Sequence, residues 1–425
     1  MKRHVALRTL AACCAALAAG FPARAARADD VPPAPGGVHL VAALEQAPAA
    51  LVVVFDAPKA LDDEAWLATA RVEHSLRGEA PERVSIAWEE RARARPVRFA
   101  AGDRVLIAAE ALPGYSIWRQ RIPDAEQRAR TWFVAENGDA FLRTPGPGSM
   151  LTLEHYLRLA PDVRHAATGV GYLVDLAEAA EPPLALSATE RIAALGNLGA
   201  TLDAGSVPHL IRALLRPDAT DELREGLLNL IASGPRDLLQ PPLEKLAQAD
   251  ALAPAPVFEA LARIGSGSLP SDQALRLLDA KGSVAHRRVG ARHASGAAVQ
   301  RLPAVLRSDP APPVRAAAAE RWLAQRGLDG VDAMRPALRD SDPAVRNAAL
   351  IALAKLGPGA VPTLRGEIES APPEEARPAV AALVLAGGPE SVRALKDLAA
   401  NHPDAGVRML AETALGRPLG HLDAK

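Results

Sequence analysis

Two histidines and three arginines form a compact group of side chains that could bind a ligand. The group, which we call the basic patch, consists of His286, Arg287, Arg288, Arg292 and His293. The two histidines are seven residues apart and share one helix face, but two histidines without a third ligand do not make a zinc site. We therefore predict no metal here. The patch is either a solvated helix face or a docking site for an acidic protein partner.

Four arginines recur further along the chain at a fixed interval of 31 residues: Arg315, Arg346, Arg377 and Arg408. Guanidinium groups at the same place in successive structural units could form a ladder that binds anions along a groove. A constant interval of about 20 to 50 residues also indicates a repeat architecture. Whether the arginines bind a ligand or stabilise the fold depends on the structural elements that carry them.

The sequence contains no constellation typical of an enzyme. It has no Gly-x-Ser-x-Gly elbow, no His-Glu-x-x-His pair and no phosphate-binding loop. Glu89-Glu90 and the acids at 62–64 are adjacent in sequence, so their side chains point apart or into solvent and do not make an acid and base pair. We predict a non-enzymatic protein without cofactors. An enzyme with a cleft between two domains is a minor alternative.

Helical repeats surround the arginine row. First helices are expected to begin near residues 187, 221, 254, 284, 312, 343, 374 and 403, which gives seven helical pairs and a final single helix. Asp342-Pro343 is a typical helix start, and Gly327, Gly357 and Gly388 mark helix ends at nearly constant offsets from the arginines. Second helices carry apolar residues at three- and four-residue steps, and such a stripe must be buried against a neighbour.

The motif Asp-Pro-x-Val-Arg-x-x-Ala-x-x-x-Leu followed by Gly resembles the HEAT-like repeats named after phycobilisome bilin lyases. The resemblance covers residues 187–420 and implies an α-α superhelical solenoid that serves as a protein-binding scaffold. Bilin attachment belongs to a few cytoplasmic members and is not expected here. The family also implies that the arginines pair with the acidic start of an adjacent repeat, for which this chain offers Asp309, Asp342 and Asp404. We therefore predict a structural role for the row.

Residues 38–142 follow a different pattern, with short alternating runs separated by turn signals. Strands are expected at 51–55, 66–76, 84–88, 104–108, 115–118 and 131–134, which together favour a small antiparallel barrel or sandwich. The order of Ala70–Gly78, Trp88 and Gly102–Leu106 resembles the OB-like barrels of the netrin-module and protease-inhibitor type, and the resemblance implies the architecture alone. Four tryptophans in this region either pack the core or offer a stacking face for a ligand, and we favour the core: Trp66, Trp88, Trp118 and Trp132.

Proline and glycine place the remaining boundaries. Residues 143–150 form a predicted linker, and 151–183 form helices that cap the open end of the repeats and end at Pro182-Pro183. At the other end of the chain, residues 1–28 resemble a secretory signal peptide, with basic residues before the apolar run Leu10–Phe21 and small-residue cleavage sites after it. That run is too short to span a bilayer.

The predicted signal peptide sets the expected compartment. Cys13 and Cys14 are the only cysteines and would leave with it, so the mature chain would have neither a disulfide nor a thiolate ligand. Leu10–Cys13 matches a lipoprotein-processing tetrapeptide, but Arg8 leaves almost no apolar stretch before it, and we predict no lipid anchor. The expected location is the periplasm.

Charge and architecture together give the functional prediction. With 49 basic and 50 acidic residues, the chain has no general attraction to nucleic acid. We predict a multidomain α and β protein, exported and non-enzymatic, that acts as a scaffold or adaptor and binds an unidentified protein through the repeat surface. The alternative is that the β domain inhibits or binds an exported hydrolase, with the solenoid as adaptor.

Overall fold

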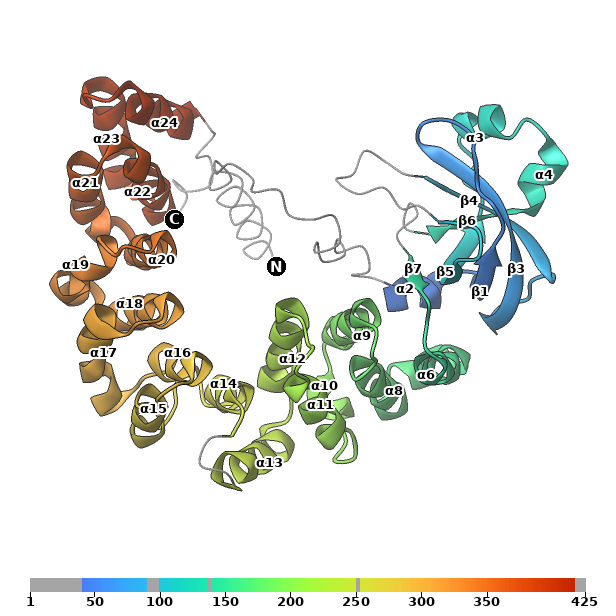
Figure 1. The fold of residues 1–425 in the computed structure, drawn as a ribbon, viewed down its shortest axis with the longest axis horizontal. Coiled ribbons are helices and arrows are strands. Elements are labelled where there is room, and N and C mark those ends of the chain that lie inside the picture. Colours follow the sequence, from blue (N-terminus) through green and yellow to red (C-terminus); the bar gives the residue numbers. More distant parts are fainter. Residues whose placement is uncertain (1–39, 90–98, 136–139, 250–252, 417–425) are drawn as a thin grey trace. The chain divides into compact units, whose positions relative to one another are not determined.

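The computed structural model describes residues 40–89, 99–135, 140–249 and 253–416. The predicted signal peptide, both cysteines and the last residues of the predicted repeats lie outside this part. The described chain divides into two compact units, an N-terminal unit up to Ile264 and a C-terminal unit from Gly265. Each unit is described on its own (Figure 1).

Five strands at the start of the N-terminal unit close into a small barrel: β1 (Ala49–Phe55), β3 (Ala65–Arg77), β4 (Arg83–Glu89), β5 (Arg104–Ala111) and β6 (Thr131–Val134). β1 pairs antiparallel with both β3 and β5, which closes the ring. The other neighbours are β3 with β4 and β5 with β6, both antiparallel, and β4 with β6, which is parallel. Two short strands extend the sheet: β2 (Lys59–Ala60) and β7 (Phe141–Arg143).

Alternate residues of these strands point inward and form an aromatic core. Phe55 stacks on Phe99 with ring centroids 4.7 Å apart, and Trp88 meets both rings edge to face. Trp66 and Trp132 pack against the same core, whereas Trp118 lies in a second cluster with Phe133. All four tryptophans therefore serve packing, as the sequence analysis favoured.

The strand expected at 115–118 is a helix. α3 (Ser116–Arg121) and α4 (Ala125–Arg130) follow β5, and α3 lays Trp118 and Ile122 on Ala65, Ala87 and Phe133. Residues four apart share a face both in a helix and in a strand, so four residues of sequence are too few to distinguish the helical period from alternation. The other five expected strands are confirmed within two or three residues at each end.

The barrel is held against the helices that follow it. Glu45, in α2 (Leu40–Gln46), accepts hydrogen bonds from Arg191 Nε and Nη2 at 2.9 and 2.7 Å and another from the Tyr156 hydroxyl. Burial and the Glu45 carboxylate raise the pKa of Tyr156, so its hydroxyl stays protonated and donates. From β3, His74 Nε2 lies 2.8 Å from Glu154 Oε2, and this contact lowers the pKa of Glu154.

The predicted linker at 143–150 is shorter than expected and is fixed in place. β7 ends at Arg143, and α6 (Pro147–Arg158) begins only four residues later. Pro147 stands in the first turn of α6, where proline is tolerated. Arg104 Nη1 donates to the carbonyl of Pro145 at 2.7 Å, and the amide of Gly146 donates to Glu181 Oε1 at 2.6 Å. Composition alone therefore misled the prediction at this junction.

Helices complete the N-terminal unit: α7 (Pro161–Arg164), α8 (Ala167–Ala177), α9 (Pro182–Leu195), α10 (Leu198–Thr201), α11 (Ser206–Leu215), α12 (Asp221–Ser233), α13 (Arg236–Ala249) and α14 (Ala255–Ile264). α8 packs against α9, α9 against α12, and α12 against α14. Pro182 and Pro183 begin α9 instead of ending the preceding segment. The predicted boundary between capping helices and repeats at 187 therefore falls inside a helix.

The C-terminal unit is an array of helical pairs: α15 (Ser271–Leu278), α16 (Val284–Arg292), α17 (Gly296–Ser308), α18 (Pro312–Arg326), α19 (Val331–Leu338), α20 (Pro343–Ala354), α21 (Val361–Ser370), α22 (Pro373–Ala386), α23 (Gly388–Asn401) and α24 (Ala405–Gly416). In two of the pairs a short 3₁₀ turn connects the first helix to the second: η1 (Gly327–Gly330) lies between α18 and α19, and η2 (Gly357–Ala360) lies between α20 and α21. First helices α16, α18, α20, α22 and α24 pack in succession in one layer, with the second helices beside them (Figure 1). The predicted helix starts in this unit are confirmed within two residues.

Helix ends in the C-terminal unit follow the predicted chemistry. Gly327, Gly357 and Gly388 have φ values of 57°, 76° and 79°, a backbone region that favours glycine. Gly327 caps α18 as expected, whereas α22 is capped by Gly387 and Gly388 is the first residue of α23. Asp342 accepts the amide of Ala344 at 2.8 Å and so caps α20. Within the described residues, no helix has the length and apolar character needed to cross a membrane.

Candidate interaction surface

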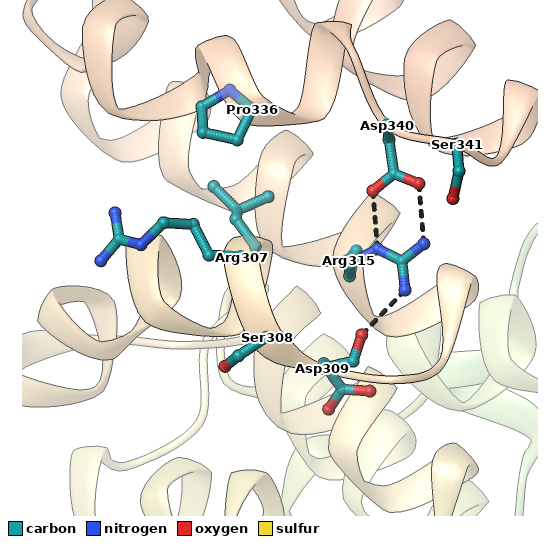
Figure 2. Close-up of a pocket in the computed structure, with 8 residues that line it drawn as sticks. Arg307, Ser308, Asp309, Arg315, Pro336, Asp340 and Ser341 are labelled. Atoms are coloured by element: carbon teal, nitrogen blue, oxygen red, sulfur yellow. Dashed lines mark hydrogen bonds and ion pairs between the residues drawn. The ribbon is translucent and has the colours of Figure 1, made fainter.

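Arginines on the first helices bind carboxylates in the loop that begins the next repeat. Arg315 Nε and Nη2 donate to the two oxygens of Asp340 at 2.6 and 2.7 Å (Figure 2). Arg287 makes the same bidentate pair with Asp309, at 2.7 and 3.1 Å. All four side chains are at most 13% exposed, so water screens these pairs weakly. We call each arginine, together with the loop position it faces, a rung.

Each carboxylate of a rung also closes its own loop. Asp340 Oδ1 accepts the amide of Asp342 at 2.9 Å, and Asp309 Oδ1 accepts that of Ala311 at 2.9 Å. The hydrogen bonds from Arg315 lower the pKa of Asp340. For Asp309, burial acts in the opposite direction, but Arg287 and the loop amide outweigh it and the pKa is lowered. Each aspartate of a rung therefore stabilises the conformation of its own loop and also binds the arginine of the preceding repeat.

A second set of bonds anchors the arginines to the loop that precedes them. Arg315 Nη1 donates to the carbonyl of Asp309 at 2.8 Å, and Arg346 Nη1 donates to that of Asp340 at 2.7 Å. Arg408 Nη1 reaches the carbonyl of His402 at 2.7 Å in the same way. In each case the acceptor stands six residues before the arginine, so the repeat fixes the position of the guanidinium group.

Two of the three predicted acidic partners have another role. Asp309 does receive an arginine, Arg287 of the preceding repeat. Asp342 and Asp404 instead cap the helices that follow them, with Asp404 accepting the amide of Val407 at 2.9 Å. A carboxylate that accepts first-turn amides faces its own helix and not the neighbouring repeat. The partner that the sequence analysis missed is Asp340, which stands 31 residues after Asp309, the same interval as the arginines.

The rungs change after Arg315. The positions 31 and 62 residues after Asp340 are Ala371 and His402, which carry no carboxylate. Arg346 lies 3.5 Å from Glu375 Oε1, a longer contact than in the filled rungs. Arg377 is exposed and makes no ion pair with any side chain that the structure describes. Of the four arginines of the row, only Arg315 pairs with an aspartate within the described residues, and the other filled rung, Arg287 with Asp309, precedes the row.

The basic patch does not form one surface. His286 and His293 are 8% and 6% exposed. His286 Nδ1 lies 2.5 Å from Ser283 Oγ, and His293 Nδ1 donates to the carbonyl of Gly267 at 3.0 Å. Arg287 belongs to a rung, Arg292 is half-buried and has an interaction of its own, and Arg288 alone is exposed. The five residues therefore form neither the solvated helix face nor the docking site that the sequence analysis offered, because the helix buries the face that holds both histidines.

An open pocket of about 520 Å³ lies beside the filled rung of Arg315. Its lining comes from the ends of α17 and α19, from the loops that follow them and from α18: Leu306, Arg307, Ser308, Asp309, Arg315, Pro336, Asp340 and Ser341. Arg307 extends away from the paired charges (Figure 2). No group of three or more metal-binding side chains occurs in the part of the chain that the structure covers.

Comparison with known proteins supports the repeat assignment. Residues 299–383 match the family model for HEAT repeats. No curated protein matches the sequence. Among solved structures, the chain is similar to human deoxyhypusine hydroxylase in complex with glycerol, at 18% identity over 64% of this chain and 98% of that chain, with a TM-score of 0.25. At that score the likeness supports no conclusion about this chain.

Proposed function

We propose that this protein is an exported, non-enzymatic scaffold that binds another protein through the surface of its helical repeats. The observation that carries the proposal is the HEAT-repeat match at residues 299–383. Within this array, Arg287 and Arg315 pair with aspartates of the protein itself. HEAT-type repeats stack into long surfaces suited to binding proteins. Because Arg287 and Arg315 already hold repeat to repeat, a partner must use what the stack leaves exposed.

We further infer that the helical pairs wind into a superhelix and that the barrel is of the OB type. A regular succession of first helices in one layer supports the superhelix. For the barrel, support comes from the strand order and from the single parallel pair, β4 with β6. Its contacts through Glu45 and His74 fit a cap on the first helices better than a module on a flexible tether.

Point variants of the full chain can test the scaffold proposal. Ile351, Leu385 and Met409, on α20, α22 and α24, are 39%, 40% and 60% exposed. Changing all three to serine removes apolar contact area without touching the core. The matched control is Tyr115→Ser with Ile117→Ser on the barrel, where the side chains are 68% and 40% exposed.

The readout is capture of a partner from the native envelope fraction. We expect the repeat variant to lose a protein that the wild type and the barrel variant both retain. Loss with the barrel variant alone would favour the alternative in which the barrel binds an exported hydrolase. Equal capture by all three proteins would contradict binding through the first helices. Export is tested separately by the mass of the mature N-terminus, and an uncleaved chain in the cytoplasm would contradict it.

A further inference from the structure

At the rung of Arg346 the loop position carries no carboxylate, and we propose that an acidic side chain of the protein partner occupies that position. The rung consists of Arg346 and loop position 371, where alanine replaces the aspartate of the two preceding rungs. The inference rests on the proposed scaffold function and names the chemistry of the partner.

The loop at the incomplete rung has the same backbone as a filled one. Ala371 follows α21 with φ −87° and ψ 152°, and its amide donates to the carbonyl of Glu367 at 3.0 Å. Asp309 follows α17 with φ −69° and ψ 127°, and its amide donates to Val305 at 3.0 Å. Both positions are therefore extended residues at a helix end. What is missing at 371 is the carboxylate and not the place for it.

The sequence gives a reason for this loss. Asp309 and Asp340 each accept an amide two residues later. The corresponding residue after Ala371 is Pro373, which has no amide hydrogen. An aspartate at 371 would therefore not close its own loop, and only the bond to the arginine would favour it.

Arg346 is nevertheless held as the paired arginines are. Its Nη1 donates to the carbonyl of Asp340 at 2.7 Å, which matches the 2.8 Å bond from Arg315 to Asp309. The side chain is 23% exposed, and its contact with Glu375 is 3.5 Å long with the glutamate 46% exposed. Among the described residues no acceptor is hydrogen-bonded to its Nε. The Nε and Nη2 donors of Arg346, of which only Nη2 has the long Glu375 contact, are therefore available to a carboxylate.

The pocket beside Arg315 borders this incomplete rung. Asp340 and Ser341 line it, and both give their carbonyls to Arg346 Nη1, at 2.7 and 3.3 Å. A peptide segment in the pocket could thus extend along the loops to Arg346. The pocket offers space for a peptide segment of the partner, and Arg346 offers a fixed positive charge for its carboxylate.

The charge of these loops favours an acidic segment. Three exposed arginines near the loops have no ion pair within the described chain: Arg307, Arg339 and Arg377. The acids of the two filled loops already have partners, because Asp309 and Asp340 bind arginines and Asp342 caps α20. Beside Arg346, Glu375 makes only the 3.5 Å contact. Surplus guanidinium groups beside paired carboxylates attract acidic residues of a protein and steer their approach.

Filling the rung from within the chain tests the proposal. The full-length protein carries Ala371→Asp, with Ala371→Asn as the uncharged control of the same shape. Gln325→Glu, at an exposed position of α18, adds the same charge elsewhere. The probe is a fluorescein-labelled hexaglutamate peptide, followed by anisotropy at low salt. We expect Ala371→Asp to bind it about tenfold more weakly than wild type, and both controls to bind within about twofold.

Thermal unfolding supplies a readout that needs no partner. Ala371→Asp should melt at a higher temperature than Ala371→Asn at pH 7, because the new carboxylate pairs with Arg346. An equal or lower melting temperature would overturn the geometry of the rung. Peptide binding that is unchanged in Ala371→Asp would overturn the assignment of the acidic site to it.

Capture of the native partner separates this inference from the proposed function. Loss of the partner with Ala371→Asp but not with Ala371→Asn supports the inference. Retention of the partner with Ala371→Asp overturns it, while the scaffold proposal stands. If no chain captures a protein but the peptide and melting results hold, the carboxylate site is supported and the scaffold proposal fails.

Discussion

Arg315 and Asp340 belong to successive repeats and share two hydrogen bonds of 2.6 and 2.7 Å, with 13% and 8% of their side chains exposed. Arg315→Ala would leave the Asp340 carboxylate buried without its cation. We expect the free energy of unfolding to fall by roughly 2 to 3 kcal/mol, measured by chemical denaturation. Arg346→Ala, which removes carbonyl bonds and one long contact, should cost only about 1 kcal/mol.

Arg335→Ala is the matched control for this comparison. Its pair with Asp332 is 60% and 90% exposed, so its loss should not change stability measurably. Equal losses for Arg315→Ala and Arg335→Ala would show that the rungs contribute nothing beyond surface charge.

Acid should weaken the filled rungs. The folded-state pKa values of Asp309 and Asp340 are lowered, so the unfolded chain binds protons more readily at these groups. Their stabilisation is complete above the unfolded value, about 3.9, and is lost as pH falls through the lower folded values. The difference in unfolding free energy between wild type and Asp340→Asn should be constant at neutral pH and shrink below about pH 4. A difference that persists in strong acid would argue against an ionic origin.

The contact between α2 and α9 should behave as a coupled unit. Arg191→Met leaves Glu45, whose side chain is 8% exposed, without its cation, and we expect a loss of roughly 3 kcal/mol. The double variant with Glu45→Gln should recover part of that loss. Hydrogen exchange should show α2 and α9 losing protection together, whereas Arg158→Ala, at a 65% exposed position, should leave both protected. Additive single losses would mean that the two residues are not coupled.

Two glycines give a matched test of helix ends. Gly357 has a φ of 76° and Gly366 lies within α21, and an added methyl group meets no atom within 4 Å at either site. Gly357→Ala should destabilise by about 1 kcal/mol through backbone strain, and Gly366→Ala should stabilise by up to about 1 kcal/mol. Melting curves compare the two directly. Destabilisation by both would show that space, and not backbone conformation, decides the outcome.

The repeat helices could be predicted because their start and stop signals are local. Pro312, Pro343 and Gly357 act on the first or last turn of a helix, so their effect needs no knowledge of distant contacts. The helix α2 and the helical state of residues 116–118 were missed for the opposite reason. Each is short, and each is decided by the surface it packs on, which the sequence does not reveal.

The arginine row was visible in the sequence, but its partners were less so. Asp340 and Asp342 are two residues apart, and the one next to Pro343 has the stronger helix-start signal. In the structure Asp342 caps α20, and Asp340 pairs with Arg315. A search for acids at the interval of the arginines would have found Asp340. The burial of His286 could not be found that way, since it depends on how α16 rotates against its neighbours.

The hydrogen bond from the Val41 amide to Ser187 Oγ spans 146 positions of the chain. When a chain emerges with its N-terminus first, the residues of α2 appear long before their binding site on α9 exists. The barrel can pair its strands early, but α2 must wait until the chain has been synthesised as far as α9, 146 positions later. Closing so long a loop is slow compared with local helix formation. The N-terminal unit should therefore complete its folding late, and a nascent chain cut before Arg191 should leave the apolar face of α2 available to chaperones.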